Sequence, residues 1–110
     1  MSVKINGTTI TMTRGDTLKV KIDMVTNDNQ PYIPTIYEVV RFAMKKSYKD
    51  ETPLIRKVLD NNSLILQLDP EDTEALKQPS EYVYDIQITH TNGDVDTFIS
   101  GKLRITEEVD

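Results

Sequence analysis

The sequence contains no cysteine and no tryptophan, and it has one histidine and four glycines. Without cysteine there is no disulfide framework. A zinc site is also excluded, because such sites are built mainly from Cys and His side chains. The absence of cysteine favours an intracellular or particle-borne protein over a small secreted module.

Long apolar runs are missing as well. No window of the sequence approaches the roughly 18 apolar residues of a membrane helix, and residues 1–20 lack the apolar run of a signal peptide. Gly-rich phosphate loops, nucleophile elbows and kinase-like signatures are absent too. We therefore expect a protein that is not an enzyme and that has no cofactor, no small-molecule substrate and no membrane contact.

A net positive charge is lacking: the chain is acidic, with a net charge of −5 and a pI near 4.8. This balance argues against nucleic acid as a partner, because phosphate contacts need a basic surface. The charge is uneven: residues 1–58 carry a net +4 and residues 59–110 a net −9. The two halves can complement each other between copies in an assembly. The favoured alternative is that both halves interleave in one sheet system, where their charges cancel locally.

What the sequence does contain is apolar alternation with a period of two. Residues 17–24 place Leu18, Val20, Ile22 and Met24 on one face, which is typical of a half-buried strand. The same reasoning predicts strands at residues 8–13, 39–45, 54–58, 63–68, 82–91 and 102–106. Connections of hairpin length lie at residues 14–16, 60–62 and 92–93.

The turn at Asn92-Gly93 is the strongest hairpin signal in the chain. A two-residue turn there would pair His90 with Val95, Ile88 with Thr97 and Ile86 with Ile99. A short helix is expected from Pro70 to about Lys77, because Asp69 can cap it, Pro70 suits its first position and Pro79 ends it.

Seven to eight short strands and one short helix near residues 70–77 predict an all-β fold. Its architecture would be an immunoglobulin-like antiparallel β-sandwich, formed as a single domain over residues 1–110. The hydrophobic content of 37% indicates a modest core. Support from a neighbouring chain is therefore plausible.

Four apolar residues are candidates for an interface. Phe98 faces outward as a contact anchor if Ile99 faces the core, but it belongs to the core if the register shifts by one residue. Tyr32, Ile33 and Ile36 lie in a long loop. They can form a contact patch, or they can be tucked under the edge of the sandwich, which we favour.

The remaining polar candidates are interpreted as structural. His90 can be a general base or metal ligand, but a side chain at a strand end beside the 92–93 turn is favoured. The acidic clusters at residues 27–29 and 94–96 can hold a hard cation, but they lack the ligand count of a calcium loop. Solvated turns are favoured there, so no catalytic or metal site is predicted.

The tripeptide Arg14-Gly15-Asp16 matches the sequence that integrin-type receptors bind on adhesion proteins. Gly15 can supply turn geometry, Asp16 can hydrogen-bond the turn, and an alternating strand follows at once. We therefore interpret the tripeptide as a turn.

The order of these parts resembles a known family of small phage virion domains. The pattern comprises Gly15-Asp16 before the alternating strand, a strand at 40–45, an acidic helical turn, Tyr82-Val83-Tyr84-Asp85-Ile86, the stretch 92–97 and Gly101-Lys102-Leu103. It resembles the N-terminal immunoglobulin-like domain of siphophage baseplate upper proteins, along residues 9–109.

This resemblance implies a non-enzymatic phage or prophage structural protein. Such a domain serves assembly or attachment in the tail or baseplate, contacts other virion proteins and itself, and is assembled in the bacterial cytoplasm into the virion. It supplies no catalytic residues. The alternative is a bacterial surface or carbohydrate-binding β-sandwich module with Tyr32, Tyr37 and Tyr48 as sugar platforms.

Overall fold

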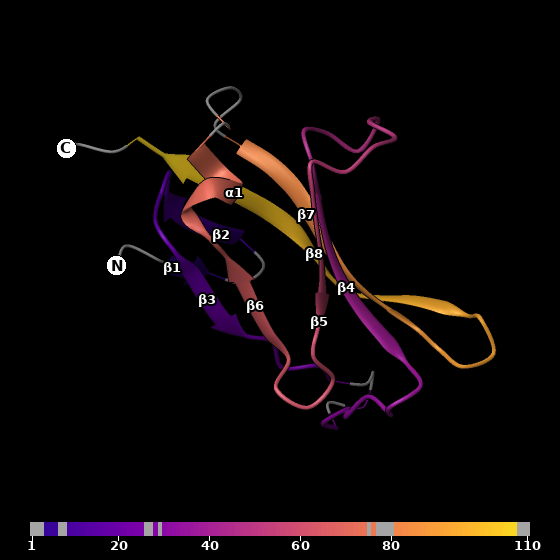
Figure 1. Ribbon diagram of the computed structural model, residues 1–110. Coiled ribbons are helices and arrows are strands. Elements are labelled where there is room, and N and C mark those ends of the chain that lie inside the picture. Colours follow the sequence, from indigo (N-terminus) through magenta and orange to yellow (C-terminus); the bar gives the residue numbers. More distant parts are fainter. Residues whose placement is uncertain are drawn as a thin grey trace.

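The computed structural model describes residues 4–6, 9–25, 28, 30–74, 76 and 81–107. Within these ranges the protein is mostly β, with eight strands and one short helix (Figure 1). The elements in chain order are β1 (Lys4–Asn6), β2 (Thr9–Thr13), β3 (Leu18–Lys21), β4 (Val39–Lys45), β5 (Ile55–Leu59), β6 (Ile65–Leu68), α1 (Pro70–Glu74), β7 (Glu81–Thr89) and β8 (Val95–Thr106).

The strands form a curled six-stranded sheet, in the order β1-β2-β8-β7-β4-β5, and a small second sheet of β3 and β6. The prediction of a wholly antiparallel fold is wrong at one place, because β2 and β8 run parallel. Parallel neighbours need a long connection, and here almost the whole chain lies between the two strands. Opposite ends of the sequence therefore meet side by side (Figure 1).

Two of the three predicted hairpins are wrong. Residues 14–16 connect β2 to β3, and residues 60–62 connect β5 to β6, but in each case the two strands belong to different sheets. Short connections between alternating strands look the same in sequence, whether they join neighbours or cross between sheets.

The third predicted hairpin, between β7 and β8, is confirmed. Its loop is one residue longer than expected, because the His90 N–H donates to the Asp94 carbonyl (2.8 Å) and the Gly93 N–H donates to the His90 carbonyl (2.9 Å). Gly93 has a φ of 93°, as is common for the last residue of a three-residue hairpin loop.

The longer loop and a bulge change the register of this hairpin. Ile86 pairs with Ile99 as predicted, but Ile88 pairs with Asp96 and the predicted pairing of Ile88 with Thr97 is wrong. The shift lies between Ile86 and Gln87, which leaves Phe98 as the extra residue of a β-bulge. The strand then continues to Thr106 without the predicted break.

Helix α1 is shorter than predicted. It ends at Glu74 rather than near Lys77, and the predicted stop at Pro79 lies outside the described residues. Asp69 lies at the expected cap position before Pro70. The bond seen there is the reciprocal one of a capping box, in which the Asp72 carboxylate accepts a hydrogen bond from the Asp69 N–H (2.7 Å).

Both sheets contribute buried apolar side chains to one hydrophobic core. Alternate residues of β4, namely Val40, Phe42 and Met44, are fully buried, and the Phe42 ring lies 5.6 Å from that of Tyr84. The second sheet adds apolar side chains from β3 and β6. Each fully buried large apolar side chain contributes about 1.5–3 kcal/mol to folding.

Candidate functional site

A buried carboxylate lies directly before β4. Glu38 is 7% exposed, and its Oε1 atom accepts a hydrogen bond from the Thr35 N–H (2.9 Å). The Tyr32 hydroxyl donates to both carboxylate oxygens, at 2.9 and 2.7 Å. These bonds fold residues 32–38 around the Glu38 side chain.

His90 joins this carboxylate to the β7–β8 hairpin. Its Nδ1 atom contacts Glu38 Oε2, and its Nε2 atom lies 2.7 Å from Asp96 Oδ2. A ring held between two carboxylates is best satisfied when both nitrogens carry a proton. The interpretation of His90 as a side chain at a strand end is confirmed, but its bond to Glu38 was not predicted.

We call Tyr32, Glu38, His90 and Asp96 the carboxylate cluster. The Thr35 N–H is the main cause that lowers the pKa of Glu38 to about 2, and Tyr32 and His90 act in the same direction. Hydrogen bonding to Glu38 and then to Asp96 raises the pKa of His90 above its ordinary 6.5. Burial, followed by the Glu38 carboxylate, raises the pKa of Tyr32 to about 12.

These shifts predict a stability plateau between about pH 4.5 and 6.5. The pKa of Glu38 is depressed, so its stabilisation is lost as the pH falls from 4.5 toward 2. The pKa of His90 is raised, so its stabilisation is lost as the pH rises above 6.5. Thermal melts from pH 2 to 9 should show both slopes, and His90→Gln should remove the alkaline one. An unchanged alkaline slope in His90→Gln contradicts the assignment.

The contacts of the carboxylate cluster anchor the loop before β4 to the β7–β8 hairpin. The Tyr32 hydroxyl donates to Glu38 and is hard to deprotonate, so it is a poor nucleophile. Among the described residues, no group of three or more His, Cys, Asp or Glu side chains is arranged to hold a metal ion. The cluster joins the loop before β4 to the turn end of the β7–β8 hairpin.

The four predicted interface residues separate into two pairs. Tyr32 and Phe98 are half-buried against the core, with ring centroids 5.6 Å apart. Ile33 and Ile36 are 79% and 84% exposed. The tucked position is therefore right for Tyr32 and wrong for Ile33 and Ile36. Phe98 packs against the core although Ile99 pairs with Ile86 as predicted, because Phe98 is the bulged residue.

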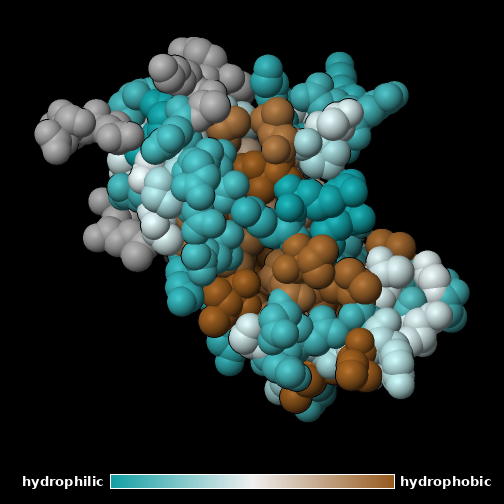
Figure 2. Space-filling view, viewed as in Figure 1, coloured by the Kyte–Doolittle hydropathy of each residue, from teal (hydrophilic) through white to brown (hydrophobic). Residues whose placement is uncertain are grey.

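Figure 2 shows apolar areas interspersed with hydrophilic ones toward the end of the molecule where the loop before β4 lies in Figure 1. Ile36 and Val58 line one groove of about 540 Å³. Val25 and Ile33 line a second groove of about 480 Å³. Asn61 and Asn62 line both grooves, so the two meet there. We call Val25, Ile33, Ile36 and Val58 the apolar end.

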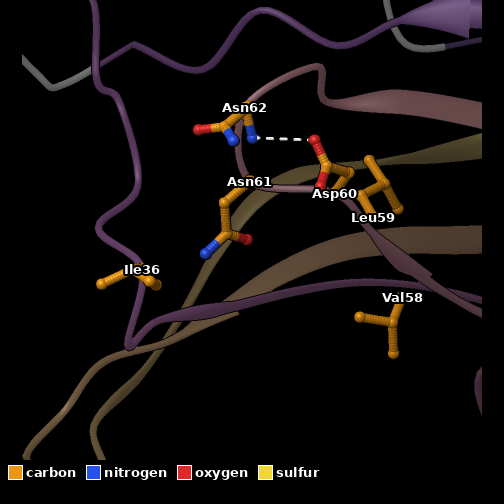
Figure 3. Close-up of a pocket in the computed structure, with 6 residues that line it drawn as sticks. All are labelled: Ile36, Val58, Leu59, Asp60, Asn61 and Asn62. Carbon is orange, nitrogen blue, oxygen red and sulfur yellow. Dashed lines mark hydrogen bonds between the residues drawn. The ribbon is translucent and has the colours of Figure 1, made fainter.

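Asn61 holds this surface in place. Its side-chain N–H₂ donates to the carbonyls of Thr35 (2.6 Å) and Glu38 (2.7 Å), and Figure 3 shows it pointing toward the segment that carries Ile36. Asp60 in turn accepts the N–H groups of Asn62 and Ser63 (3.1 and 2.9 Å). Ile36 therefore projects from a loop fixed on both sides.

The Arg14-Gly15-Asp16 stretch is confirmed as a turn. Gly15 has a φ of 83°, and the Asp16 N–H donates to the Thr13 carbonyl (3.1 Å). Arg14 is 6% exposed. Its guanidinium donates twice to the Leu76 carbonyl (3.0 and 2.8 Å) and also binds Glu107. In this position the guanidinium is turned away from any receptor.

The three tyrosines proposed as sugar platforms do not share a surface. Tyr37 precedes β4 and Tyr48 follows it, so they lie at opposite ends of a seven-residue strand about 23 Å long. Tyr32 is half-buried and bound to Glu38.

Comparison with models of protein families, with curated proteins and with solved structures finds no match to this chain. Within the described part of the chain, no helix has the length and apolar character needed to cross a membrane.

Proposed function

We propose that this protein is a non-enzymatic structural module of a phage or prophage virion, used for assembly or attachment in the tail or baseplate. Its two sheets would form an immunoglobulin-like β-sandwich, and its partners would be other virion proteins and a second copy of itself. The sequence pattern shared with baseplate domains supports the phage assignment, and the apolar end supports a role in protein contact.

The observation that carries the contact role is the exposure of Ile33 and Ile36 on an anchored loop. Exposed apolar side chains that gather on one surface of a protein often mark a site of protein contact. The loop is held by Glu38 and Asn61, so little conformational freedom is lost when a partner binds. Pre-organisation of this kind raises affinity.

Charge around the apolar end fits a protein partner. Asp60 lines the Ile36 groove, while Lys21 and Asp23 line the Ile33 groove. An apolar centre with a mixed polar rim is the usual anatomy of a protein–protein interface.

The test uses the proteins encoded by the genes on either side of this one. We expect one of them to be a tail, portal or tape-measure protein and to bind the wild-type chain. Ile36→Ser combined with Ile33→Ser should weaken that binding roughly 30-fold, as expected when contact anchors are removed. Tyr48→Ser removes a comparably exposed apolar side chain at the far end of β4 and serves as the control.

Two results would overturn the proposal. One is a gene neighbourhood without any virion component. The other is equal binding by the wild type, the double isoleucine variant and Tyr48→Ser.

A further inference from the structure

The six-stranded sheet has open edges that differ in how well they are protected against pairing with another strand. Strand β5 pairs only with β4. Strand β8 pairs with β7 from Val95 to Arg104, but with β2 only from Leu103 to Thr106. Among the described strands, residues 95–102 of β8 therefore have a neighbour on one side only. The hairpin that carries them extends beyond the rest of the sheet (Figure 1).

The β5 edge carries devices that prevent strand addition. Lys57 lies on the same face as the buried Ile55 and Leu59, and its ammonium group is 3.0 Å from the Asp72 carboxylate. An inward-pointing charge on an edge strand is a known protection against edge-to-edge pairing. Antiparallel self-pairing centred on Lys57 would also place two lysines opposite each other, which is destabilising.

The free part of β8 lacks such devices over most of its length. Its sequence from residue 95 to 101 is VDTFISG, which is rich in residues that favour strands. The free part carries two charges: Asp96 is bound to His90, and Lys102, at its end, pairs with Glu81 of β7. An exposed edge of this length and composition is a template for another strand.

The backbone groups available for pairing follow from the turn. The His90 N–H donates to the Asp94 carbonyl, and bonded and non-bonded pairs alternate along an antiparallel ladder. Ile88 and Asp96 are therefore a bonded pair. The N–H and C=O groups of Val95 and Thr97 point away from β7, toward the open edge.

We propose that residues 95–102 of β8 pair antiparallel with the same segment of a second copy, so that two six-stranded sheets join across a two-fold axis. A register centred on the Phe98–Ile99 bulge places Thr97 opposite Ser100 of the second copy, and Asp96 opposite Gly101. No like charges then face each other. The inference deepens the proposed function, because it assigns the surface through which the chain binds itself.

The primary test is amide hydrogen exchange on the wild-type chain across a dilution series, combined with light scattering. We expect a dimer whose Val95 and Thr97 amides are protected, and loss of that protection on dilution to the monomer. A chain that stays monomeric at high concentration overturns the proposal. So does a dimer in which these two amides exchange freely.

Variants locate the surface. Thr97→Pro removes the outward N–H without removing a bond to β7, so the dimer dissociation constant should rise at least tenfold. Thr97→Val keeps the N–H but loses the hydroxyl, and it should dimerise like the wild type. If the proline variant fails to fold, the double variant Val95→Lys with Thr97→Lys replaces it. Its lysines place like charges on the pairing edges of the two copies, so it should also weaken the dimer. Dimerisation of the variants at wild-type strength overturns the assignment.

A variant at the apolar end distinguishes a failure of this inference from a failure of the proposed function. Ile36→Ser should leave the dimer intact while it weakens binding of a virion partner. Loss of partner binding with an intact dimer concerns only the apolar end, whereas a monomeric wild-type chain that still binds the partner overturns only the β8 pairing.

Discussion

Glu38→Ala is expected to lower the free energy of unfolding by about 3 kcal/mol, the usual cost of breaking a buried charge pair by removing one partner. The variant removes the acceptor of the Thr35 N–H and of the Tyr32 hydroxyl. It also leaves His90 with Asp96 as its one remaining carboxylate partner in the carboxylate cluster. A loss of this size is a large fraction of the 5–15 kcal/mol typical of a whole domain.

Urea denaturation at pH 6 measures the effect, because His90 is then largely protonated and the Glu38 carboxylate is charged. Glu81→Ala is the matched control. Glu81 also pairs with two cations, Lys102 and Arg104, but all three side chains are well exposed. Its loss should cost less than about 1 kcal/mol. Equal destabilisation by the two variants would mean that burial of Glu38 contributes nothing.

Glu38→Ala also tests whether the carboxylate cluster holds the loop of the apolar end in place. Without the Glu38 carboxylate, the segment that carries Ile33 and Ile36 loses its bonds to the Thr35 N–H and the Tyr32 hydroxyl, but it keeps the Asn61 bonds to the backbone carbonyls of residues 35 and 38. Faster hydrogen exchange is expected in residues 32–37, together with weaker partner binding, although no exposed isoleucine has changed. Glu38→Ala is therefore expected to reduce both stability and the proposed partner binding.

The strands were predictable because burial on one face imposes a period of two. The alternation of Leu18, Ile22 and Met24 marks side chains that are indeed buried, and the same holds for alternate residues of β4 and β7. What a period of two cannot give is the identity of the neighbouring strand. For that reason the sequence predicts hairpins at residues 14–16 and 60–62, where the structure has connections between the two sheets.

The candidate site was less predictable for two physical reasons. First, Glu38 and His90 are separated by 52 positions, and no local pattern marks a contact made only through the sheet. Second, the bulge at Phe98 shifts the register by one residue, and a one-residue shift exchanges the two faces of a strand. The sequence did identify Ile33 and Ile36 as candidates, but it favoured burial for side chains that the structure exposes.

The second large loss of stability is expected from a substitution in the turn at Arg14-Gly15-Asp16. Arg14→Ala is expected to cost about 2–3 kcal/mol, because a charged group makes hydrogen bonds worth more than neutral ones, and because its buried aliphatic stem is lost as well. The variant leaves the Leu76 carbonyl without its two guanidinium donors, and it removes the contact that ties Glu107 to β2. The part of the chain after α1 would then be held less firmly to the β2–β3 turn.

Arg14→Lys distinguishes the guanidinium geometry from the charge. A lysine keeps the positive charge, but it cannot present two N–H groups in a planar fork to one carbonyl, so we expect an intermediate loss of about 1 kcal/mol. Arg104→Ala is the control, because the Arg104 side chain is 62% exposed and, among the described residues, pairs with Glu81 at the surface, where pairs contribute less than about 1 kcal/mol. Urea midpoints should fall in the order Arg104→Ala, Arg14→Lys, Arg14→Ala. If Arg14→Ala unfolds at the same midpoint as Arg104→Ala, the arginine does not anchor the turn, and its side chain would have to be free enough to meet a receptor after all.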